Sequence, residues 1–557
     1  MESITAIITV VLALAMVMVL FSWISASMDR APGAPNLLEL SPSYIVYQDG
    51  WGYTLAKDCK ISEVAYSDRN SAHVIQYCID HLPANVSGGA GGLIWIKVGT
   101  YEIDTGIIIN RSDVKLMGEA SQRSTILLKT ANIDMFTLHG TGRIAFVEFA
   151  NLAFFGNDRA YTGRMIVADT FSQGPVITNC QFNGNDGTAI SLYDVWGQGP
   201  TIRDCKIYDC GNATDALVEI LGGSNAIIID NVGIAPMDYV GIHIDTISNN
   251  VVITNCQGEA NSDSPSPQIW IEGFSVTVTD SHFNSVGEDV AIIEDEGDRN
   301  TISNNIISGA YYLCYGIYFH GTRSVIDGNY IYNAKNGIRI ENGWATVSNN
   351  FMDACVNGIY SSGAILATGN HIQYSKGDGF WMDGSGSGII DANLIENSGD
   401  GTTPAVFSGL LLDGSCENLI TNNRITDWRV TKTQQYGVKE IAPAQSNWIY
   451  DNYLAGNDED GVLKVGSTTK LHNNIGFTTE YHGIYVCNGN GSATYYIPHG
   501  LVATPTYFSV LPYYPDANAS EGMYVWADDT YLIVCYFVAP DGGTNNIRLT
   551  WYAEVYH

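Results

Sequence analysis

The hydrophobic positions of this chain recur in a short motif. An apolar residue, two small or polar residues and then Asn, Cys or Ser, usually followed by x-apolar, occurs thirteen times at spacings of 20 to 30 residues. Self-similarity at this period predicts a solenoid in which each copy marks one coil. The fourth positions are Cys180, Cys205, Asn231, Cys256, Ser281, Asn305, Asn329, Asn350, Asn370, Asn393, Asn423, Asn452 and Asn474.

A second pattern, Gly-Ile-x-Ile and its variants, lies between these motifs at residues 241–244, 316–319, 337–340, 358–361, 379–382 and 409–412. Each copy predicts a short strand, opened by a glycine that can take positive φ. Two or three such strands per coil, each paired with the next coil, predict a parallel β-helix. Asn side chains stacked at one corner would bond the coils above and below, and Cys there would be a small buried filler.

The third residue of each such strand should point outward, because its neighbours pack inside. We call these residues the outward row. Aromatic rings in it would stack on sugar rings, so we predict glycan binding there; a stripe covered by a loop or by another subunit is the alternative. The expected row is Ser191, Glu219, His243, Trp270, Ile292, Tyr318, Arg339, Tyr360, Trp381, Leu411 and Lys439. The predicted glycan contacts are His243, Trp270, Tyr318, Arg339, Tyr360 and Trp381.

Two residues further on lies a second expected row, which we call the corner row, and six of its eleven members are acidic. Asp245, Glu272 and Glu294 fall on successive coils, where carboxylates could approach to roughly 5 Å. They are candidates for a calcium (Ca²⁺) site or for acid–base glycoside hydrolysis; a solvated acidic edge is the third interpretation. The row is Tyr193, Leu221, Asp245, Glu272, Glu294, His320, Glu341, Ser362, Asp383, Asp413 and Ile441.

Residues 74–82 have a helical period, and a glycine run and a strand pattern follow them. With Ala72, Ile75, Gln76, Gly91-Gly92 and the pattern to Tyr101, this stretch resembles the start of pectate lyase-like proteins. The resemblance implies a right-handed parallel β-helix over residues 60–480, with a helical cap. That superfamily includes lyases, hydrolases, epimerases, phage tailspikes and adhesins.

Catalytic motifs of the polygalacturonase type are only partly matched. The chain has Phe319-His320-Gly321 where those enzymes have Gly-His-Gly, and Arg339-Ile340-Glu341 where they have Arg-Ile-Lys. The resemblance therefore implies the scaffold without its catalytic residues.

Residues 3–28 contain no charged residue and are long enough to cross a bilayer, so we predict a membrane-anchoring helix over residues 1–28. A cleaved signal peptide ending at residues 25–27 is the alternative. The start Ile-Thr-Ala-Ile-Ile-Thr-Val-Val and the end Phe21-Ser22-Trp23 resemble the N-terminal helix of archaeal type IV pilins and archaellins, which implies a filament. Residues 29–59 are expected to be a linker or N-terminal extension.

Residues 481–557 alternate apolar and polar positions between Pro and Asp-Gly-Gly turns, which predicts a small β-sandwich. Through His499-Gly500-Leu501 and residues 503–506 this part resembles a C-terminal module of viral fibre and microbial surface proteins. Such modules cap, trimerise or bind.

The chain carries 58 acidic and 26 basic residues, a net charge of -32, which disfavours nucleic acid as a partner. No cofactor is required, and the eleven cysteines form no C-x-x-C pair, although a Cys59–Cys78 bridge is conceivable. Five N-x-S/T sequons favour an extracellular location. They start at Asn85, Asn110, Asn212, Asn490 and Asn518.

These observations predict a surface-anchored β-helix protein for adhesion or recognition. Its partner would be a glycan or another cell-surface molecule, and the chain could act as a homo-oligomer or as a subunit of a filament or virion appendage. The alternative is a polysaccharide lyase or glycoside hydrolase that uses the same face.

Overall fold

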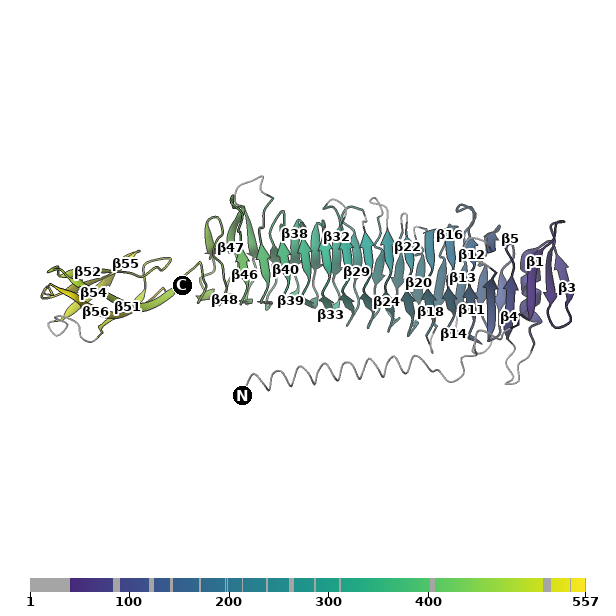
Figure 1. Ribbon diagram of the computed structural model, residues 1–557, viewed down its shortest axis with the longest axis horizontal. Helices are drawn as coiled ribbons and strands as arrows, with labels where there is room; N and C mark the ends of the chain where they lie inside the picture. The colour runs from purple at the N-terminus through teal and green to yellow at the C-terminus, as the bar shows by residue number, and fades with distance from the viewer. Residues whose placement is uncertain are drawn as a thin grey trace.

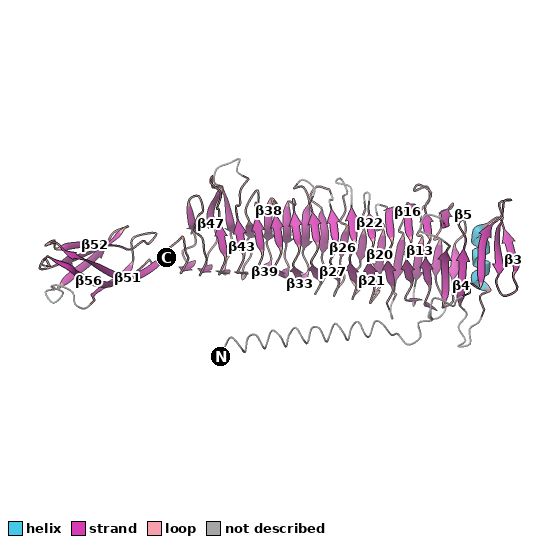
Figure 2. Cartoon of the chain, viewed as in Figure 1, coloured by secondary structure: helices cyan, strands magenta, loops and turns pink. Residues whose placement is uncertain are grey.

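The chain forms a long coil of short strands, followed by a smaller group of antiparallel strands beyond its last turn (Figures 1 and 2). The computed structural model describes residues 41–83, 91–119, 125–140, 144–169, 172–195, 197, 199–212, 214–236, 239–259, 265–284, 287–309, 312–400, 406–513, 522–540 and 542–555. The predicted anchor at residues 1–28 and the sequons at Asn85 and Asn518 lie outside these residues. Among the helices of the described residues, none has the length and apolarity needed to cross a membrane.

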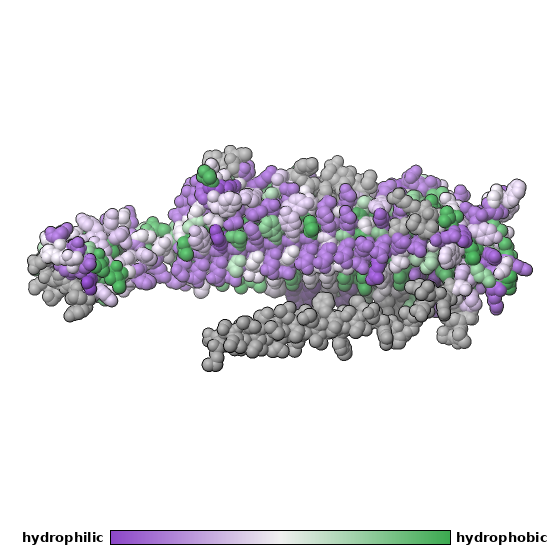
Figure 3. All heavy atoms as spheres, in the orientation of Figure 1, coloured by the Kyte–Doolittle hydropathy of each residue, from purple (hydrophilic) through white to green (hydrophobic). Residues whose placement is uncertain are grey.

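Each full coil contributes one strand to each of three parallel sheets, as β33 (Thr322–Asp327), β34 (Tyr330–Tyr332) and β35 (Asn336–Ile340) do. They pair in parallel with the corresponding strands of the next coil, β36 (Trp344–Ser348), β37 (Phe351–Asp353) and β38 (Asn357–Ser361). The predicted right-handed parallel β-helix is therefore confirmed, with about 15 turns. In the view of Figure 3 the coils have a mostly hydrophilic surface with scattered apolar side chains.

The first sheet runs along one side of the coil. Its parallel strands are β4 (Gly92–Ile96), β7 (Val114–Gly118), β11 (Glu148–Ala150), β15 (Val176–Thr178), β18 (Thr201–Arg203), β21 (Ile228–Asp230), β24 (Val252–Thr254), β27 (Thr277–Thr279), β30 (Thr301–Ser303), β33 (Thr322–Asp327), β36 (Trp344–Ser348), β39 (Ala364–Thr368), β42 (Ile389–Asp391), β45 (Leu419–Thr421), β48 (Trp448–Tyr450) and β50 (Lys470–His472).

The second sheet follows the first across a sharp corner. Its strands are β5 (Gly99–Ile103), β8 (Thr125–Lys129), β12 (Ala153–Phe155), β16 (Gln181–Asn185), β19 (Lys206–Cys210), β22 (Gly233–Ala235), β25 (Gln257–Glu259), β28 (His282–Asn284), β31 (Ile306–Ser308), β34 (Tyr330–Tyr332), β37 (Phe351–Asp353), β40 (His371–Gln373), β43 (Leu394–Glu396) and β46 (Arg424–Thr426). A short parallel pair, β10 (Ile144–Ala145) and β14 (Ser172–Gln173), lies apart from the three sheets.

The third sheet carries the outward row. Its strands are β6 (Ile107–Ile109), β9 (Phe136–Leu138), β13 (Ile166–Asp169), β17 (Ile190–Tyr193), β20 (Val218–Leu221), β23 (Ile242–Ile244), β26 (Ile269–Ile271), β29 (Ala291–Asp295), β32 (Tyr315–Phe319), β35 (Asn336–Ile340), β38 (Asn357–Ser361), β41 (Phe380–Asp383), β44 (Phe407–Asp413), β47 (Gln434–Ile441) and β49 (Asp460–Leu463).

The predicted helical cap is present as α2 (Ser71–Asp80). The side chain of Asn70 caps it by accepting a hydrogen bond from the backbone N–H of Ala72 at 2.9 Å, and its apolar face, including Val74 and Ile75, is buried. Within residues 29–59, which were expected to be a linker or N-terminal extension, the described part from residue 41 on contains two strands. Strands β1 (Tyr44–Gln48), β2 (Thr54–Asp58) and β3 (Glu63–Asp68) pair with one another in antiparallel, and β1 joins the first sheet by pairing in parallel with β4. Residues of β1 and β2 are buried at alternate positions.

The predicted asparagine column lies at the corner between the first and second sheets. Asn350 shows the pattern: its Oδ1 accepts from the backbone N of Asn329 at 3.0 Å and from Asn329 Nδ2 at 2.9 Å, while its own Nδ2 donates to Ile326 O at 2.9 Å and to Asn370 Oδ1 at 3.0 Å. Corresponding bonds link Asn305 through to Asn474. Each amide therefore satisfies buried groups on the coils beside it.

One member of the column was assigned wrongly. Val232, not Asn231, takes the buried position, because register pairs Asp230 with Thr254, two residues before Cys256. Asn231 is exposed and has φ 54°, as Asn255 also does in the next coil. The residue directly before each column residue has a left-handed backbone, which Asn tolerates. Asn therefore suits both the column position and the position before it.

The glycines that open the third-sheet strands, such as Gly316, Gly337 and Gly358, do not use the positive φ that glycine permits. Instead, a Cβ on Gly358 would lie 2.3 Å from Ile372 Cγ2 and 2.7 Å from Gly379 O of the next coil. Glycine is required there because the coils approach closely.

Residues 480–554 form two three-stranded antiparallel sheets around one apolar cluster that includes Ile497, Leu532 and Leu549. One consists of β51 (Glu480–Gly489), β56 (Gly543–Glu554) and β53 (Tyr507–Pro512), and the other of β52 (Thr494–Pro498), β55 (Tyr531–Tyr536) and β54 (Met523–Ala527). All eleven cysteines lie in described residues and are free, so Cys59 and Cys78 form no bridge.

Replacing Asn350 with Ala tests the asparagine column. We expect the free energy of unfolding to fall by about 3 kcal/mol, because buried donors and acceptors on two neighbouring coils lose their partner. Denaturant unfolding, followed by circular dichroism, measures the change. The matched control is Asn349→Gly, one residue earlier, which keeps the left-handed backbone of an exposed Asn. Equal effects of the two substitutions would contradict the account.

Candidate functional site

The outward row of the third sheet is continuous in the structure. Strand register places His243 beside Trp270, Tyr318 beside Arg339, and Tyr360 beside Trp381, and all six predicted glycan contacts share this row. The observed row is Ser191, Glu219, His243, Trp270, Glu294, Tyr318, Arg339, Tyr360, Trp381, Leu411 and Lys439.

One position of the row differs from the prediction. Ile292 is fully buried, and Glu294 takes its place between Trp270 and Tyr318. The shift arises because the inward position after Glu294 is a carboxylate: Asp295 is buried, and its Oδ1 accepts from Asn300 Nδ2 at 2.7 Å and from the backbone N of Gly297 at 3.0 Å. The sequence pattern assumes an apolar inward residue, so it missed this register.

The same shift changes the corner row. Glu296 follows Glu272 there, and Glu294 does not. Asp245 is occupied by the turn beside it, since its carboxylate accepts from the backbone N of Gly222 at 2.7 Å and of Ser248 at 2.9 Å. The predicted group of Asp245, Glu272 and Glu294 is therefore not assembled as a cation or catalytic cluster.

The outward row from His243 to Trp381 and the corner row beside it form one surface, which we call the face. His243 and Trp270 lie at one end of it. Their rings stack with centroids 4.6 Å apart, and His243 Nε2 lies 2.8 Å from Glu272 Oε2. Beside them is a cavity of about 200 Å³ lined by Asn212, Thr214, Asp215, Ala216, Tyr239, Val240, His243, Ser266 and Trp270. This hollow gives one end of the row a recess bordered by polar groups.

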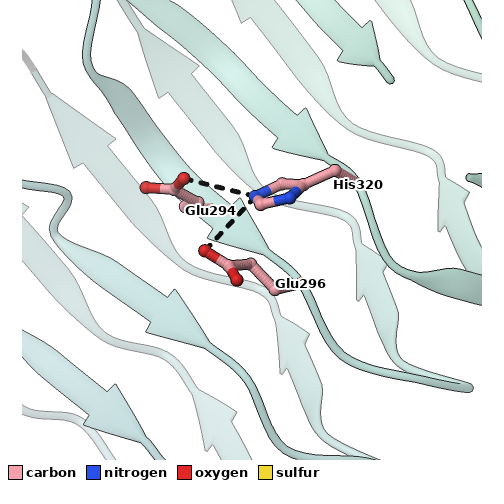
Figure 4. Close-up of side chains that lie close together, drawn as sticks. All are labelled: Glu294, Glu296 and His320. Carbon is pink, nitrogen blue, oxygen red and sulfur yellow. Dashed lines mark hydrogen bonds and ion pairs between the residues drawn. The ribbon is translucent and has the colours of Figure 1, made fainter. Parts of the chain in front are cut away.

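Glu294, Glu296 and His320 meet in the middle of the face (Figure 4). His320 Nε2 lies 3.3 Å from Glu294 Oε1 and 3.4 Å from Glu296 Oε1. The hydrogen bond to Glu294 is the main cause that raises the pKa of His320. Each of the three residues offers one possible ligand atom, and these atoms all lie within 4.8 Å of one another. Within the described part of the chain, this is the one group of three His, Cys, Asp or Glu residues that meets this condition.

Arg339 organises the following part of the face. Its Nε donates to Glu341 Oε1 at 2.8 Å, its Nη1 donates to the hydroxyl of Tyr315 at 2.6 Å, and its guanidinium carbon lies 4.6 Å from the centre of the Tyr315 ring. The same carbon lies 5.3 Å from the centre of the Tyr318 ring and 5.2 Å from that of Tyr360. One cation thus holds three rings in place.

Carboxylates of the corner row fix the ring edges. Tyr318 donates to Glu341 Oε2 at 2.6 Å, and Tyr360 donates to Asp383 Oδ2 at 2.6 Å. Burial is the largest cause that raises the pKa of Tyr318, followed by the bond to Glu341. The Tyr360 ring meets Trp381 edge to face, with centroids 5.2 Å apart. These rings are ordered before any ligand arrives.

The sequence reasoning missed two members of this site. Glu296 would have been found by reading Asp295 as an inward residue. Tyr315 begins β32 two residues before its apolar pair, and no periodic signal marks it.

The sequons in described residues differ in accessibility. Asn110 and Asn490 are exposed, whereas Asn212 is half-buried, with its Nδ2 donating to Asp186 O at 3.2 Å. Glycosylation at these positions stays a prediction.

The chain matches the family described as "Right handed beta helix region" over residues 100–256, 166–312, 216–364 and 358–497. These matches together cover more than half of the sequence, and the chain belongs to this family. A search of curated proteins found no match.

Solved structures with a similar fold come from viruses and bacteria. ORF18 of Geobacillus virus E2 is 18% identical with a TM-score of 0.42, and the match covers 52% of this chain and 58% of that one. A tailspike protein mutant of E. coli bacteriophage HK620 in complex with pentasaccharide is 12% identical, with a TM-score of 0.48 and coverage of 87% and 90%. The mannuronan C-5 epimerase AlgE6 A-module of Azotobacter vinelandii is 14% identical, with a TM-score of 0.33 and coverage of 72% and 94%. The chain thus spans just over half of the length of the Geobacillus virus protein.

Asp295 predicts a defined pH dependence of stability. Burial raises its pKa from 3.8 to about 6, so the folded state binds this proton more tightly than the unfolded state between those values. The free energy of unfolding should therefore fall by roughly 2 kcal/mol as the pH rises from 4 to 6, and level off above about pH 7.

Asp295→Asn should remove that fall, because an amide oxygen can accept the same two hydrogen bonds without a charge. Unfolding midpoints measured between pH 4 and 7 test this. Asp280→Asn, an exposed acid after β27 on the same coil, is the control and should keep the wild-type slope. An unchanged slope in the Asp295 variant would show that another group titrates.

Proposed function

We propose that the outward row of the third sheet binds a glycan chain along its length. The observation that carries this proposal is the ordered series of half-exposed rings from His243 to Trp381, with carboxylates along one side. Six strand spacings separate these two residues, a span of about 29 Å, which suits an extended polymer better than a single small molecule.

Sugar recognition follows from the chemistry of this row. The face of a sugar ring carries C–H groups that pack on aromatic rings, while its hydroxyls donate to carboxylates. Trp270 and Trp381 supply the larger aromatic surfaces, and Glu272 and Asp383 lie beside them as acceptors. Because Tyr318 and Tyr360 are already held by hydrogen bonds, little side-chain freedom would be lost on binding.

The charge of the face favours a neutral glycan. Between His243 and Trp381, Arg339 is the one residue of the row with a positive charge at every ordinary pH. Its guanidinium is already paired with the carboxylate of Glu341. A polyanionic chain would therefore meet uncompensated carboxylates.

The proposal includes a recognition or adhesion role at an outer surface of a cell or virion, with residues 3–28 as the attachment to a membrane or filament. A homo-oligomer is part of the same proposal. The support is the stalk-like coil, the binding face along it and the apolar N-terminal sequence.

Cleavage of the glycan is the second candidate, since carboxylate oxygens of Glu294 and Glu296 lie within 4.8 Å of each other. Hydrolysis or β-elimination would produce new reducing ends or unsaturated sugars from a polysaccharide panel. We expect retention without such products. Turnover that Glu294→Gln abolishes would replace the binding proposal with an enzyme.

Trp381→Ala tests the binding row. We expect the affinity of the full chain for a retained glycan to fall by about 10-fold, the loss of one stacking surface. Glycan-array retention followed by calorimetry measures it. The matched control is Trp448→Ala, which removes an exposed Trp on the first sheet and should leave affinity unchanged. Equal losses in both variants would contradict the proposal.

A further inference from the structure

Histidine meets glutamate at two places on this face, and the two geometries differ. His243 Nε2 lies 2.8 Å from one carboxylate oxygen, the distance of a charge-assisted hydrogen bond. His320 Nε2 lies 3.3 Å and 3.4 Å from oxygens of two different carboxylates, so it is shared between them at nearly equal, longer distances. The second arrangement is not that of a simple ion pair.

These two nitrogen–oxygen separations match those between the ligands of a metal site. A tetrahedral ion with bonds of about 2.0–2.1 Å places its ligand atoms about 3.3–3.4 Å apart. Figure 4 shows both carboxylates turned toward the same imidazole nitrogen, and all three ligand atoms lie within 4.8 Å of one another. We propose that Glu294, Glu296 and His320 form a binding site for a divalent transition-metal ion of the zinc type.

The ligand set selects the class of ion. An imidazole nitrogen suits zinc and its transition-metal neighbours, whereas calcium takes oxygen ligands. The three side chains are partly exposed, at 23% for Glu294, 28% for His320 and 34% for Glu296. A fourth position therefore faces solvent, open to water or to a hydroxyl of a bound molecule.

Neighbouring residues hold the ligands in place. Trp270 Nε1 donates to Glu296 Oε1 at 3.2 Å, and the Tyr318 ring stacks on His320 with centroids 4.7 Å apart. Strands β29 and β32 are paired in register, which fixes the backbone of Glu294 and of Phe319, the residue directly before His320. Such outer contacts orient metal ligands and raise affinity.

The inference stands apart from glycan binding, and the probe is Zn²⁺ alone. Calorimetric titration of the metal-stripped full chain should show one site, and His320→Gln should weaken its affinity by at least about 10-fold. His472→Gln is the matched control, since His472 Nδ1 lies 3.3 Å from Glu480 Oε1 and the described residues place no third ligand of this kind beside them. Glu296→Gln gives a second variant should the His320 variant fail to fold.

Cobalt substitution separates this site from the cysteines. We expect visible absorption bands of Co²⁺ bound by nitrogen and oxygen, lost in His320→Gln and kept in His472→Gln. Thiolate charge-transfer bands, or zinc binding that neither the His320 nor the Glu296 substitution weakens, would overturn the proposal. Zinc binding without any glycan retention would leave this site standing and remove the proposed function instead.

Discussion

The stacking register between coils is the constraint on which this molecule depends. A parallel strand pair offers evenly spaced backbone bonds that do not by themselves choose an alignment, and a slip of one residue would turn every inward side chain outward. The buried amide of Asn350 prevents such a slip, because it must meet Asn329 on one side and Asn370 on the other. The close contact between Gly358 and Gly379 restricts the same alignment at another corner.

Register also creates the candidate site. Residues more than twenty positions apart in the chain become neighbours at one strand spacing, so a binding face needs only one suitable residue per coil. Arg339 contacts rings from the coils on both sides of its own, which no local motif could arrange. The face therefore depends on how the coils stack on one another. A substitution that disturbs the asparagine column would alter the binding surface on another side of the coil.

Much of this architecture could be predicted because its physical requirements repeat. The corner needs an amide that bonds in two directions, and Asn at regular spacing reveals it. Where two requirements favour the same residue type, the prediction fails: Asn231 fits the left-handed position and the column equally well in sequence, and only the register decides. Asp295 misled the alignment for a related reason, since a carboxylate in the inward position is tolerated only through hydrogen bonds from Asn300 and Gly297 that the sequence does not show. The grouping of Glu296 with His320 in the middle of the face depends on the same register, so the sequence pattern did not predict it either.

The central claim is that one register sets a continuous row of side chains and that this row binds a glycan. A crystal structure of the chain with a bound oligosaccharide tests both parts in one measurement. The account predicts sugar rings along the row from His243 to Trp381, with Glu294 facing the ligand and Ile292 buried. An oligosaccharide bound on another sheet, or Ile292 facing outward in the row, would contradict it.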